Sequence, residues 1–197
     1  GYACASAAAA AGARVALADL PGSSIAMLER QLEGGPHSHH AVDATDPDAV
    51  AAMLADVLDR HGRIDAAILA QGILRNQPFL EISLDAWDAT FSVNTRSVFV
   101  MGQAVARRMA AQGHGKMVLI ASNSGRMPRL ETASYGASKA AVIHLARCMA
   151  LELAGFGITV NALCPGSTAT SMMLDNQSKG DLSRLEGVVK GSLEQWR

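Results

Sequence analysis

Short apolar segments recur along the chain, and a polar or small residue ends each of them. An apolar run of four to eight residues bounded in this way is typical of a strand buried in a sheet. The pattern predicts strands over residues 15–18, 41–42, 64–70, 117–121 and 158–163. The residues that directly follow these strands are Asp19, Asp43, Gln71-Gly72, Ser122 and Cys164-Pro165-Gly166.

Segments with the spacing and end residues of helices separate the strands. Ser23 or Ser24 can cap a helix that runs to Glu33, and Pro47 opens a helix that ends near His61. Further helices are expected over 2–11, from 83 through 101, over 134–154 and over 181–196. This alternation predicts parallel β-α-β units, and therefore a doubly wound α/β sheet with helices on both faces. No linker divides the chain, so we expect residues 1–197 to form a single domain.

Composition and charge narrow the classes of function. The chain has 197 residues, a formal net charge of -1 and 4% aromatic residues. Nucleic-acid and anionic-membrane surfaces need a basic excess, and base stacking needs more aromatic rings, so we expect neither partner. No apolar run is long enough to span a bilayer. The three cysteines have no C-x-x-C spacing, so no disulfide framework or thiolate zinc site is expected, and a reducing cytoplasm fits.

His37, His39 and His40 form a small cluster that suggests a metal site. No carboxylate accompanies them at ligand spacing, and a Gly-Gly-Pro turn precedes them. We therefore interpret the cluster as part of a solvated loop that enters a strand, and expect no bound metal.

Tyr135 and Lys139 stand four residues apart near the start of a predicted helix, so they share one face. An unperturbed tyrosine has a pKa of about 10, and a neighbouring ammonium group lowers that pKa. The tyrosinate would then serve as a general base. Ser122 ends the preceding strand, where its hydroxyl would hold a substrate oxygen. A surface tyrosine beside a surface lysine is the simpler alternative, but the chain has only two tyrosines.

Ser122 and the stretch YGASK from Tyr135 to Lys139 resemble the short-chain dehydrogenase/reductase family, and the similarity continues over nearly the whole chain. The resemblance implies a Rossmann-like fold and hydride transfer with a nicotinamide cofactor. It implies that Tyr135 exchanges the proton of the substrate hydroxyl and that Ser122 orients this oxygen. Lys139 would lower the pKa of the tyrosine and bind the nicotinamide ribose, and Asn94 would hold a water in the proton relay.

The resemblance also implies a set of cofactor-binding residues. Besides Tyr135 and Lys139, these are Gly1, Asp19, Asp43, Ala70, Gly72, Pro165, Gly166, Thr168 and Thr170. Asp19 bears on the choice of cofactor, because an acidic side chain after this strand accepts hydrogen bonds from a ribose hydroxyl and repels a 2′-phosphate. No arginine follows Asp19, so we expect NAD rather than NADP. A turn residue before Pro21-Gly22 is the alternative, and it is compatible with the same role.

Other stretches narrow the substrate. GILR from Gly72 to Arg75, Pro128-Arg129 and PGSTAT from Pro165 to Thr170 are similar to family members that oxidise a cyclohexadiene diol carboxylate in catechol siderophore synthesis. Arg129 would bind the substrate carboxylate as a bidentate pair, with a hydrogen bond from Ser167 on the other wall. A solvated loop arginine is the alternative for Arg129. For the protein, the alternatives are another alcohol or ketone, such as a 3-oxoacyl thioester, and a non-catalytic dinucleotide sensor.

The chain departs from the family pattern at two places. Leu69-Ala70-Gln71-Gly72 stands where the family has N-N-A-G, and the glycine-rich motif is absent before Gly1, which matches its last glycine. The first strand, central in the order 3-2-1-4-5-6, and the last strand would both be missing. We therefore expect an interior piece of a longer protein, with an empty slot between the strands near Leu17 and Leu69, that neither folds stably alone nor cradles a pyrophosphate. The family further implies a homotetramer formed through two long helices.

Overall fold

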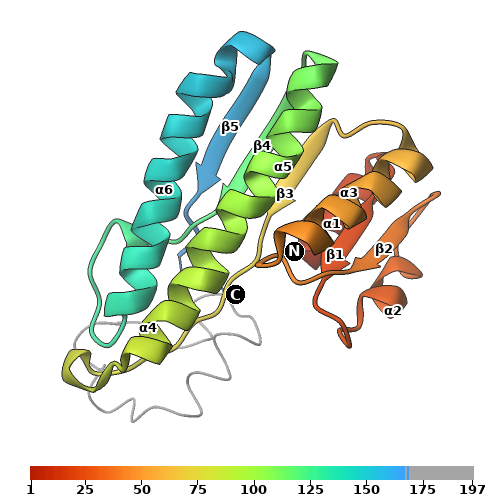
Figure 1. The fold of residues 1–197 in the computed structure, drawn as a ribbon. Helices are drawn as coiled ribbons and strands as arrows, with labels where there is room; N and C mark the ends of the chain where they lie inside the picture. The colour runs from red at the N-terminus through yellow and green to blue at the C-terminus, as the bar shows by residue number, and fades with distance from the viewer. Residues whose placement is uncertain (167, 169–197) are drawn as a thin grey trace.

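The computed structural model describes residues 1–166 and 168 of the chain, and strands alternate with helices throughout this part. The helices are α1 (Tyr2–Ala10), α2 (Ile25–Glu29), α3 (Pro47–His61), α4 (Leu84–Phe91), α5 (Ser97–Gln112) and α6 (Ala133–Leu153). The strands are β1 (Ala16–Asp19), β2 (Ser38–Ala41), β3 (Ala66–Leu69), β4 (Gly115–Ile120) and β5 (Ile158–Leu163). Figure 1 shows α3, α5 and α6 lying side by side across one face of the strands.

All strand pairs are parallel, and they form two sheets. β1 pairs with β2, and β3, β4 and β5 form a three-stranded sheet in that order. Within the described residues, β1 and β3 each have one edge without a strand partner. The gap that the sequence predicted between the strands near Leu17 and Leu69 is therefore present.

The ends of α3 illustrate how local sequence sets the elements. The Asp46 side chain accepts hydrogen bonds from the backbone N–H groups of Asp48 and Ala49, and Pro47 occupies the first turn. The helix ends at Gly62, whose φ of 78° is the left-handed conformation that glycine adopts without a steric penalty. Both ends lie where the sequence predicts them.

The core lies between the helical layer and the β3–β5 sheet. Met117 and Leu119 of β4, Val98 of α5 and Val142 of α6 are each at most 1% exposed. Successive residues of a strand point to opposite faces, so Lys116 of β4 belongs to the other face, where it is exposed. Buried apolar residues thus alternate with exposed residues along the strand, and the apolar face of the sheet packs against α5 and α6.

Several predicted boundaries differ from the observed ones. The second strand covers Ser38–Ala41 rather than residues 41–42, because the buried positions on it are Ser38 and His40 instead of apolar residues. The α2 helix has five residues and ends well before Glu33. The helix expected from 83 through 101 is divided by a π-helix at Ser92–Arg96. The helix expected over 181–196 lies outside the described residues.

We searched the described helices for one that could cross a bilayer. None of them combines the length and the apolar character that this requires.

Candidate active site

The predicted site residues gather where the strands of the three-stranded sheet end. Ala70 to Gly72 follow β3, Ser122 follows β4, and Pro165 follows β5. In Figure 1 these strands run toward the edge of the molecule where α6 begins, and α6 carries Tyr135 in its first turn. The fold therefore brings residues that are far apart in sequence to one sheet edge.

The Ser122 hydroxyl lies close enough to the Tyr135 phenol to lower the pKa of that phenol. Ser122 is 8% exposed and begins the 3₁₀ turn Asn123–Gly125, in which its Oγ atom accepts a hydrogen bond of 3.1 Å from the Ser124 N–H. This backbone contact fixes the hydroxyl at the strand end. A substrate oxygen that approaches Ser122 therefore also approaches the phenol of Tyr135.

Lys139 reaches the same place from one turn further along α6. Its side chain is buried, and Nζ donates a hydrogen bond of 2.9 Å to the carbonyl oxygen of Ile120. The Nζ atom lies 5.9 Å from the centroid of the Tyr135 ring. Burial disfavours the charged amine and lowers the pKa of Lys139 to about 8.

The direction predicted for the pKa of Tyr135 is wrong for this structure. Burial raises the pKa of the phenol, and the nearby Ser122 hydroxyl opposes this only in part. The sequence-based argument counted the charge of Lys139 but not the desolvation of the phenol. That desolvation is a property of the packed site and cannot be read from residue spacing.

Asn94 occupies the middle of the π-helix and is fully buried. Its Oδ1 atom accepts a hydrogen bond of 2.7 Å from the Ile73 N–H, and its Nδ2 group donates one of 3.0 Å to the Ile73 carbonyl. A single-turn π-helix inside an α-helix is often found at functional sites. Here it holds the Asn94 side chain against the loop that follows β3.

Of two residues that lie near these groups, Ser138 was not identified from the sequence, whereas Gly72 was predicted to bind the cofactor. Ser138 is fully buried, and its Oγ atom accepts a hydrogen bond of 3.0 Å from Asn94 Nδ2. Gly72 packs so closely that an added Cβ atom would lie 3.1 Å from Lys139 Nζ and 3.2 Å from Asn94 Oδ1. The available signal for Ser138 was a small hydroxyl residue within the interior of a long helix, where serine is not favoured.

Several of the residues predicted to hold the cofactor lie at the same sheet edge, among them Gly1, Ala70, Pro165 and Gly166. A side chain added at Gly1 would meet the Ala70 Cβ atom at 3.9 Å, and one at Gly166 would meet the Asn123 Nδ2 atom at 3.5 Å. The backbone of Pro165 accepts a hydrogen bond of 3.0 Å from the Asn123 N–H. Among the described residues, the buried Gln71 Nε2 atom has no hydrogen-bond partner, which fits a polar ligand at this edge.

Two acidic residues mark the neighbouring sheet edge. Asp19 ends β1 and is exposed, and its Oδ1 atom accepts a hydrogen bond of 2.7 Å from the next N–H group, that of Leu20. Asp43 binds the backbone and hydroxyl of Thr45, which lowers the pKa of its carboxyl group. Thr168 is exposed. Ser167 and Thr170 lie outside the described residues.

Arg129 lies on the loop between β4 and α6. Its backbone oxygen accepts a hydrogen bond from Thr132, and the loop is joined to the segment after β3 by a bond of 2.9 Å from the Gln77 N–H to the Glu131 carbonyl. The Arg129 side chain is partly buried. Among the described residues, no acidic side chain forms an ion pair with it. The guanidinium group therefore retains its hydrogen-bonding capacity.

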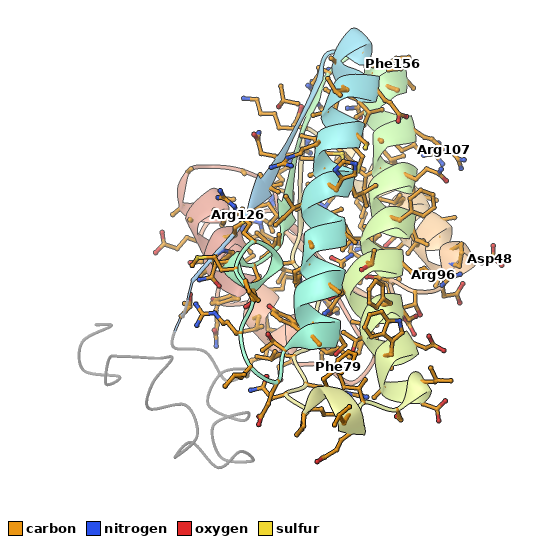
Figure 2. All side chains as sticks on the ribbon, turned by 90° about the vertical axis from the view of Figure 1, so that its left-hand side faces the viewer. Asp48, Phe79, Arg96, Arg107, Arg126 and Phe156 are labelled. Carbon is orange, nitrogen blue, oxygen red and sulfur yellow. The ribbon has the colours of Figure 1, made fainter. Side chains whose placement is uncertain are left out.

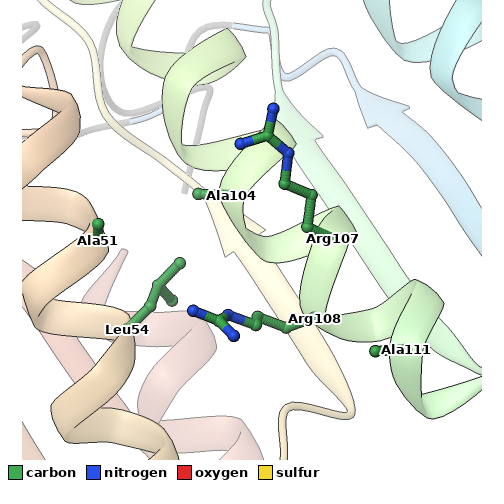
Figure 3. Close-up of a pocket in the computed structure, with 6 residues that line it drawn as sticks. All are labelled: Ala51, Leu54, Ala104, Arg107, Arg108 and Ala111. Carbon is green, nitrogen blue, oxygen red and sulfur yellow. The ribbon is translucent and has the colours of Figure 1, made fainter.

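Neither the histidine cluster nor the pocket between α3 and α5 adds to this site. Among the described residues, no group of three or more His, Cys, Asp or Glu side chains is arranged to hold a metal ion. A pocket of about 300 Å³ lies between α3 and α5, where Arg108 points across it toward Leu54 (Figure 3). None of the predicted site residues lines this pocket.

Known proteins are similar to this chain in sequence and in fold. The sequence profile of a family described as short chain dehydrogenase matches residues 1–181. The chain is 33% identical over 188 residues to 2,3-dihydro-2,3-dihydroxybenzoate dehydrogenase of Bacillus subtilis, covering 94% of this chain and 71% of that protein. It is 36% identical over 174 residues to D-threitol dehydrogenase of Mycolicibacterium smegmatis, covering 87% of this chain and 67% of that protein.

The structural comparison agrees. A crystal structure of a gluconate 5-dehydrogenase from Burkholderia cenocepacia, in complex with NADP and tartrate, superposes with a TM-score of 0.85 at 33% identity. The match covers 95% of this chain and 74% of that one. With the serine, tyrosine and lysine brought together at the sheet edge, the sequence and fold lead to one conclusion: this chain belongs to the short chain dehydrogenase family.

Proposed function

We propose that this protein is an NAD-dependent dehydrogenase that oxidises 2,3-dihydro-2,3-dihydroxybenzoate to 2,3-dihydroxybenzoate, as a step in making a catechol siderophore. The observation that carries the dehydrogenase chemistry is the meeting of three side chains at one sheet edge: the Ser122 hydroxyl lies close enough to Tyr135 to lower the pKa of the phenol, and Lys139 Nζ lies 5.9 Å from the tyrosine ring. The sequence similarity to the enzyme of Bacillus subtilis supports the substrate.

The reaction breaks the O–H bond of a substrate hydroxyl and the C–H bond at the carbon that bears this hydroxyl. Tyr135, once deprotonated to the tyrosinate, takes the proton of the substrate hydroxyl, and Ser122 holds the same oxygen by a hydrogen bond as the carbonyl forms. The positive charge of Lys139 stabilises the tyrosinate. A bound nicotinamide supplies the hydride acceptor. The ketone that results tautomerises to an aromatic ring, and this strongly favours the direction of oxidation.

Arg129 supports the proposal that the substrate is a carboxylate. Its loop leads into α6, which carries Tyr135, and is fastened to the segment after β3 by the Gln77–Glu131 backbone bond. A guanidinium group can bind a carboxylate through two parallel hydrogen bonds, which fixes the orientation of a small planar acid. We propose that Arg129 holds the substrate carboxylate and that Ser167 adds a hydrogen bond.

Asp19 supports NAD as the cofactor. Its carboxylate is exposed at the end of β1, and Leu20 and Pro21 follow it, so no adjacent cation would receive a 2′-phosphate. The neighbour from Burkholderia cenocepacia binds NADP, which makes this preference a point to measure. The three free cysteines fit the reducing cytoplasm that we expect for the protein.

A second candidate is a dehydrogenase for an open-chain polyol. The similarity to D-threitol dehydrogenase, which is 36% identical over 87% of the chain, supports it. In that case Ser122, Tyr135 and Lys139 keep their roles, and Arg129 has no substrate carboxylate to bind.

The test is a substrate panel with the full-length protein. We expect NADH and a catechol product from the dihydrodiol acid with NAD, at a kcat/KM at least about tenfold above that with D-threitol or with NADP. NADH formation from D-threitol without turnover of the dihydrodiol acid would transfer the assignment to the second candidate. A preference for NADP would contradict the role of Asp19.

A further inference from the structure

Ser138 lies one turn after Tyr135 on α6 and faces the π-helix. It is fully buried, as is Asn94 opposite it, and each forms hydrogen bonds through its side chain. A buried hydroxyl within a helix interior usually bonds locally to the backbone. Ser138 does so and also reaches a second element, so its hydroxyl joins α6 to the π-helix.

The two bonds of the Ser138 hydroxyl have a definite direction. The hydroxyl donates to the carbonyl oxygen of Tyr135 at 2.7 Å and accepts from Asn94 Nδ2 at 3.0 Å. The contacts with Ile73 show which end of the Asn94 amide carries the oxygen, because the Ile73 N–H group donates to Oδ1 and the Ile73 carbonyl oxygen accepts from Nδ2. Both N–H groups of the Asn94 amide are therefore used.

A second contact holds the same two elements together. The Thr95 hydroxyl donates a hydrogen bond of 3.2 Å to the Ser138 carbonyl oxygen. Ser138 is thus bonded to the π-helix through its backbone as well as its side chain. Replacing the hydroxyl alone removes the side-chain bond and leaves this backbone contact in place, so such a variant should fold.

The bonds continue from Asn94 to the buried amine. Asn94 holds Ile73, and the adjacent Gly72 packs against both Asn94 Oδ1 and Lys139 Nζ. This packing keeps solvent away from Lys139, which is 4% exposed. A loosened Asn94 would release the loop after β3 and open the surroundings of the amine.

We propose that Ser138 is a positioning residue of the active site, which holds Asn94 and, through it, the loop after β3 against Lys139. The inference deepens the proposed function and rests on it for the reaction that is affected. Ser138 touches no reacting atom, and it acts through Asn94.

The first test does not depend on activity. In the full-length protein, Ser138→Ala should increase the hydrogen-exchange rate of the Ile73 amide at least about tenfold, because its acceptor on Asn94 becomes mobile. Ser138→Cys, which keeps the volume but bonds weakly, should do the same. The matched control is Ser134→Ala, a buried serine of the same helix whose hydroxyl has no bond among the described residues, and it should leave the Ile73 rate unchanged.

The second test measures the reaction. Ser138→Ala should lower kcat about tenfold with a substrate KM within about twofold of the wild type, since the proton-transfer groups and not the binding groups are displaced. It should also raise the apparent pKa that governs NAD binding, because Lys139 becomes solvated. In an Asn94→Ala background, Ser138→Ala should have little further effect.

Each result decides the inference. Faster Ile73 exchange together with a lower kcat and a raised apparent pKa supports it. An Ile73 rate equal to that of Ser134→Ala overturns it, as does an unchanged kcat and pH profile in an active protein. A wild-type protein without dehydrogenase activity contradicts the proposed function, and the Ile73 rate then still decides whether Ser138 positions Asn94.

Discussion

Burial moves the pKa values of Tyr135 and Lys139 in opposite directions. It raises the pKa of the phenol and lowers that of the amine to about 8, because in each case it disfavours the charged form. At neutral pH the lysine is therefore mostly charged and the tyrosine protonated. The charge that would stabilise a tyrosinate is lost as the pH rises through about 8.

This titration gives a prediction for cofactor binding. The charged Lys139 attracts the anionic dinucleotide, so we expect the affinity for NAD to fall as the pH rises above about 8. One coupled proton limits the fall to about tenfold per pH unit. Lys139→Arg keeps a positive charge at high pH and should remove the dependence. Calorimetric titrations on both sides of this pH measure it, and a wild-type affinity that stays constant would contradict the account.

A prediction for the substrate concerns Arg129. Arg129→Ala should raise the KM for the dihydrodiol acid roughly 10- to 100-fold, the loss expected for charge-assisted hydrogen bonds, while kcat changes little. The control is Arg126→Ala on the same loop, where the arginine is exposed at the surface (Figure 2). Steady-state kinetics of the three proteins measure the effect. If Arg129→Ala and Arg126→Ala have the same KM, Arg129 does not bind the carboxylate.

Part of the site could be predicted from residue spacing alone. The interval between Tyr135 and Lys139, and a serine at a strand end, were sufficient to predict three side chains that meet. The direction of the Tyr135 pKa could not be predicted, because it depends on how much of the phenol the fold desolvates. Ser138 was missed because its contacts, to Asn94 in particular, join residues 44 positions apart.

At the scale of elements, the segment from α4 to α5 was predicted as one helix. Its apolar positions follow the ordinary helical period, and a π-helix adds one residue to a turn without a change in composition. The π-helix at Ser92–Arg96 directs the Asn94 side chain toward Ile73, whereas a regular α-helix would orient this side chain differently. The contact, and not the sequence pattern, identifies the π-helix.

The β2 strand and the α3 helix are joined by the buried His40 and the partly buried His61. Ser38 Oγ lies 2.9 Å from His40 Nε2 and 2.8 Å from His61 Nε2, and His40 Nδ1 lies 3.1 Å from an oxygen of Asp56. The pKa values of His40 and His61 are both lowered, in each case chiefly by burial. Asp56 opposes the shift of His40, and nearby cationic groups such as Arg60 reinforce it.

The lowered pKa values predict how stability changes with pH. In the range below the ordinary histidine pKa of 6.5, the unfolded chain binds more protons than the folded one, so the free energy of unfolding falls as the pH falls. His40→Gln should flatten this slope, which for one group cannot exceed about 1.4 kcal/mol per pH unit. The half-buried His61 should contribute less.

Urea unfolding at about pH 7.5 and about pH 5.5 measures the slope. The control is His144→Gln, since His144 is exposed on α6, and it should leave the slope as in the wild type. A wild-type unfolding midpoint that is the same at both pH values would show that the buried pair does not titrate differently on unfolding.

At the scale of the whole molecule, helices α3, α5 and α6 form one layer over two separate parallel sheets (Figure 1). The strand–helix alternation was sufficient to predict the parallel pairing, and the strand order implied by the family resemblance predicted the gap beside β1 and β3. It is harder to predict which apolar side chains are exposed, because apolar residues follow the same helical period whether they pack in the core or in an interface between subunits. Leu151 of α6 is 83% exposed and Phe99 of α5 is 48% exposed. Phe156 is also exposed, and Figure 2 shows it at the opposite end of the helical layer from Phe79.

These side chains give a prediction for assembly. We expect the full-length protein to be a homotetramer in which α5 and α6 of two copies pack together, because exposed apolar surface on a long helix favours association. Leu151→Lys should shift the mass measured by light scattering to a smaller species. Leu80→Lys, which changes a 95% exposed residue outside these helices, should not. A monomeric wild type at micromolar concentration would contradict the prediction.

The central claim is that Tyr135 transfers the proton of the substrate hydroxyl. The most direct measurement is NADH formation from the dihydrodiol acid by Tyr135→Phe. Tyr2→Phe is the control, since the Tyr2 hydroxyl makes no contact in the described part of the chain besides an exposed hydrogen bond to Gln31. We expect Tyr135→Phe to lower kcat by roughly 10²- to 10⁴-fold with NAD still bound, and Tyr2→Phe to equal the wild type. A Tyr135→Phe protein that retains full activity would contradict the central claim.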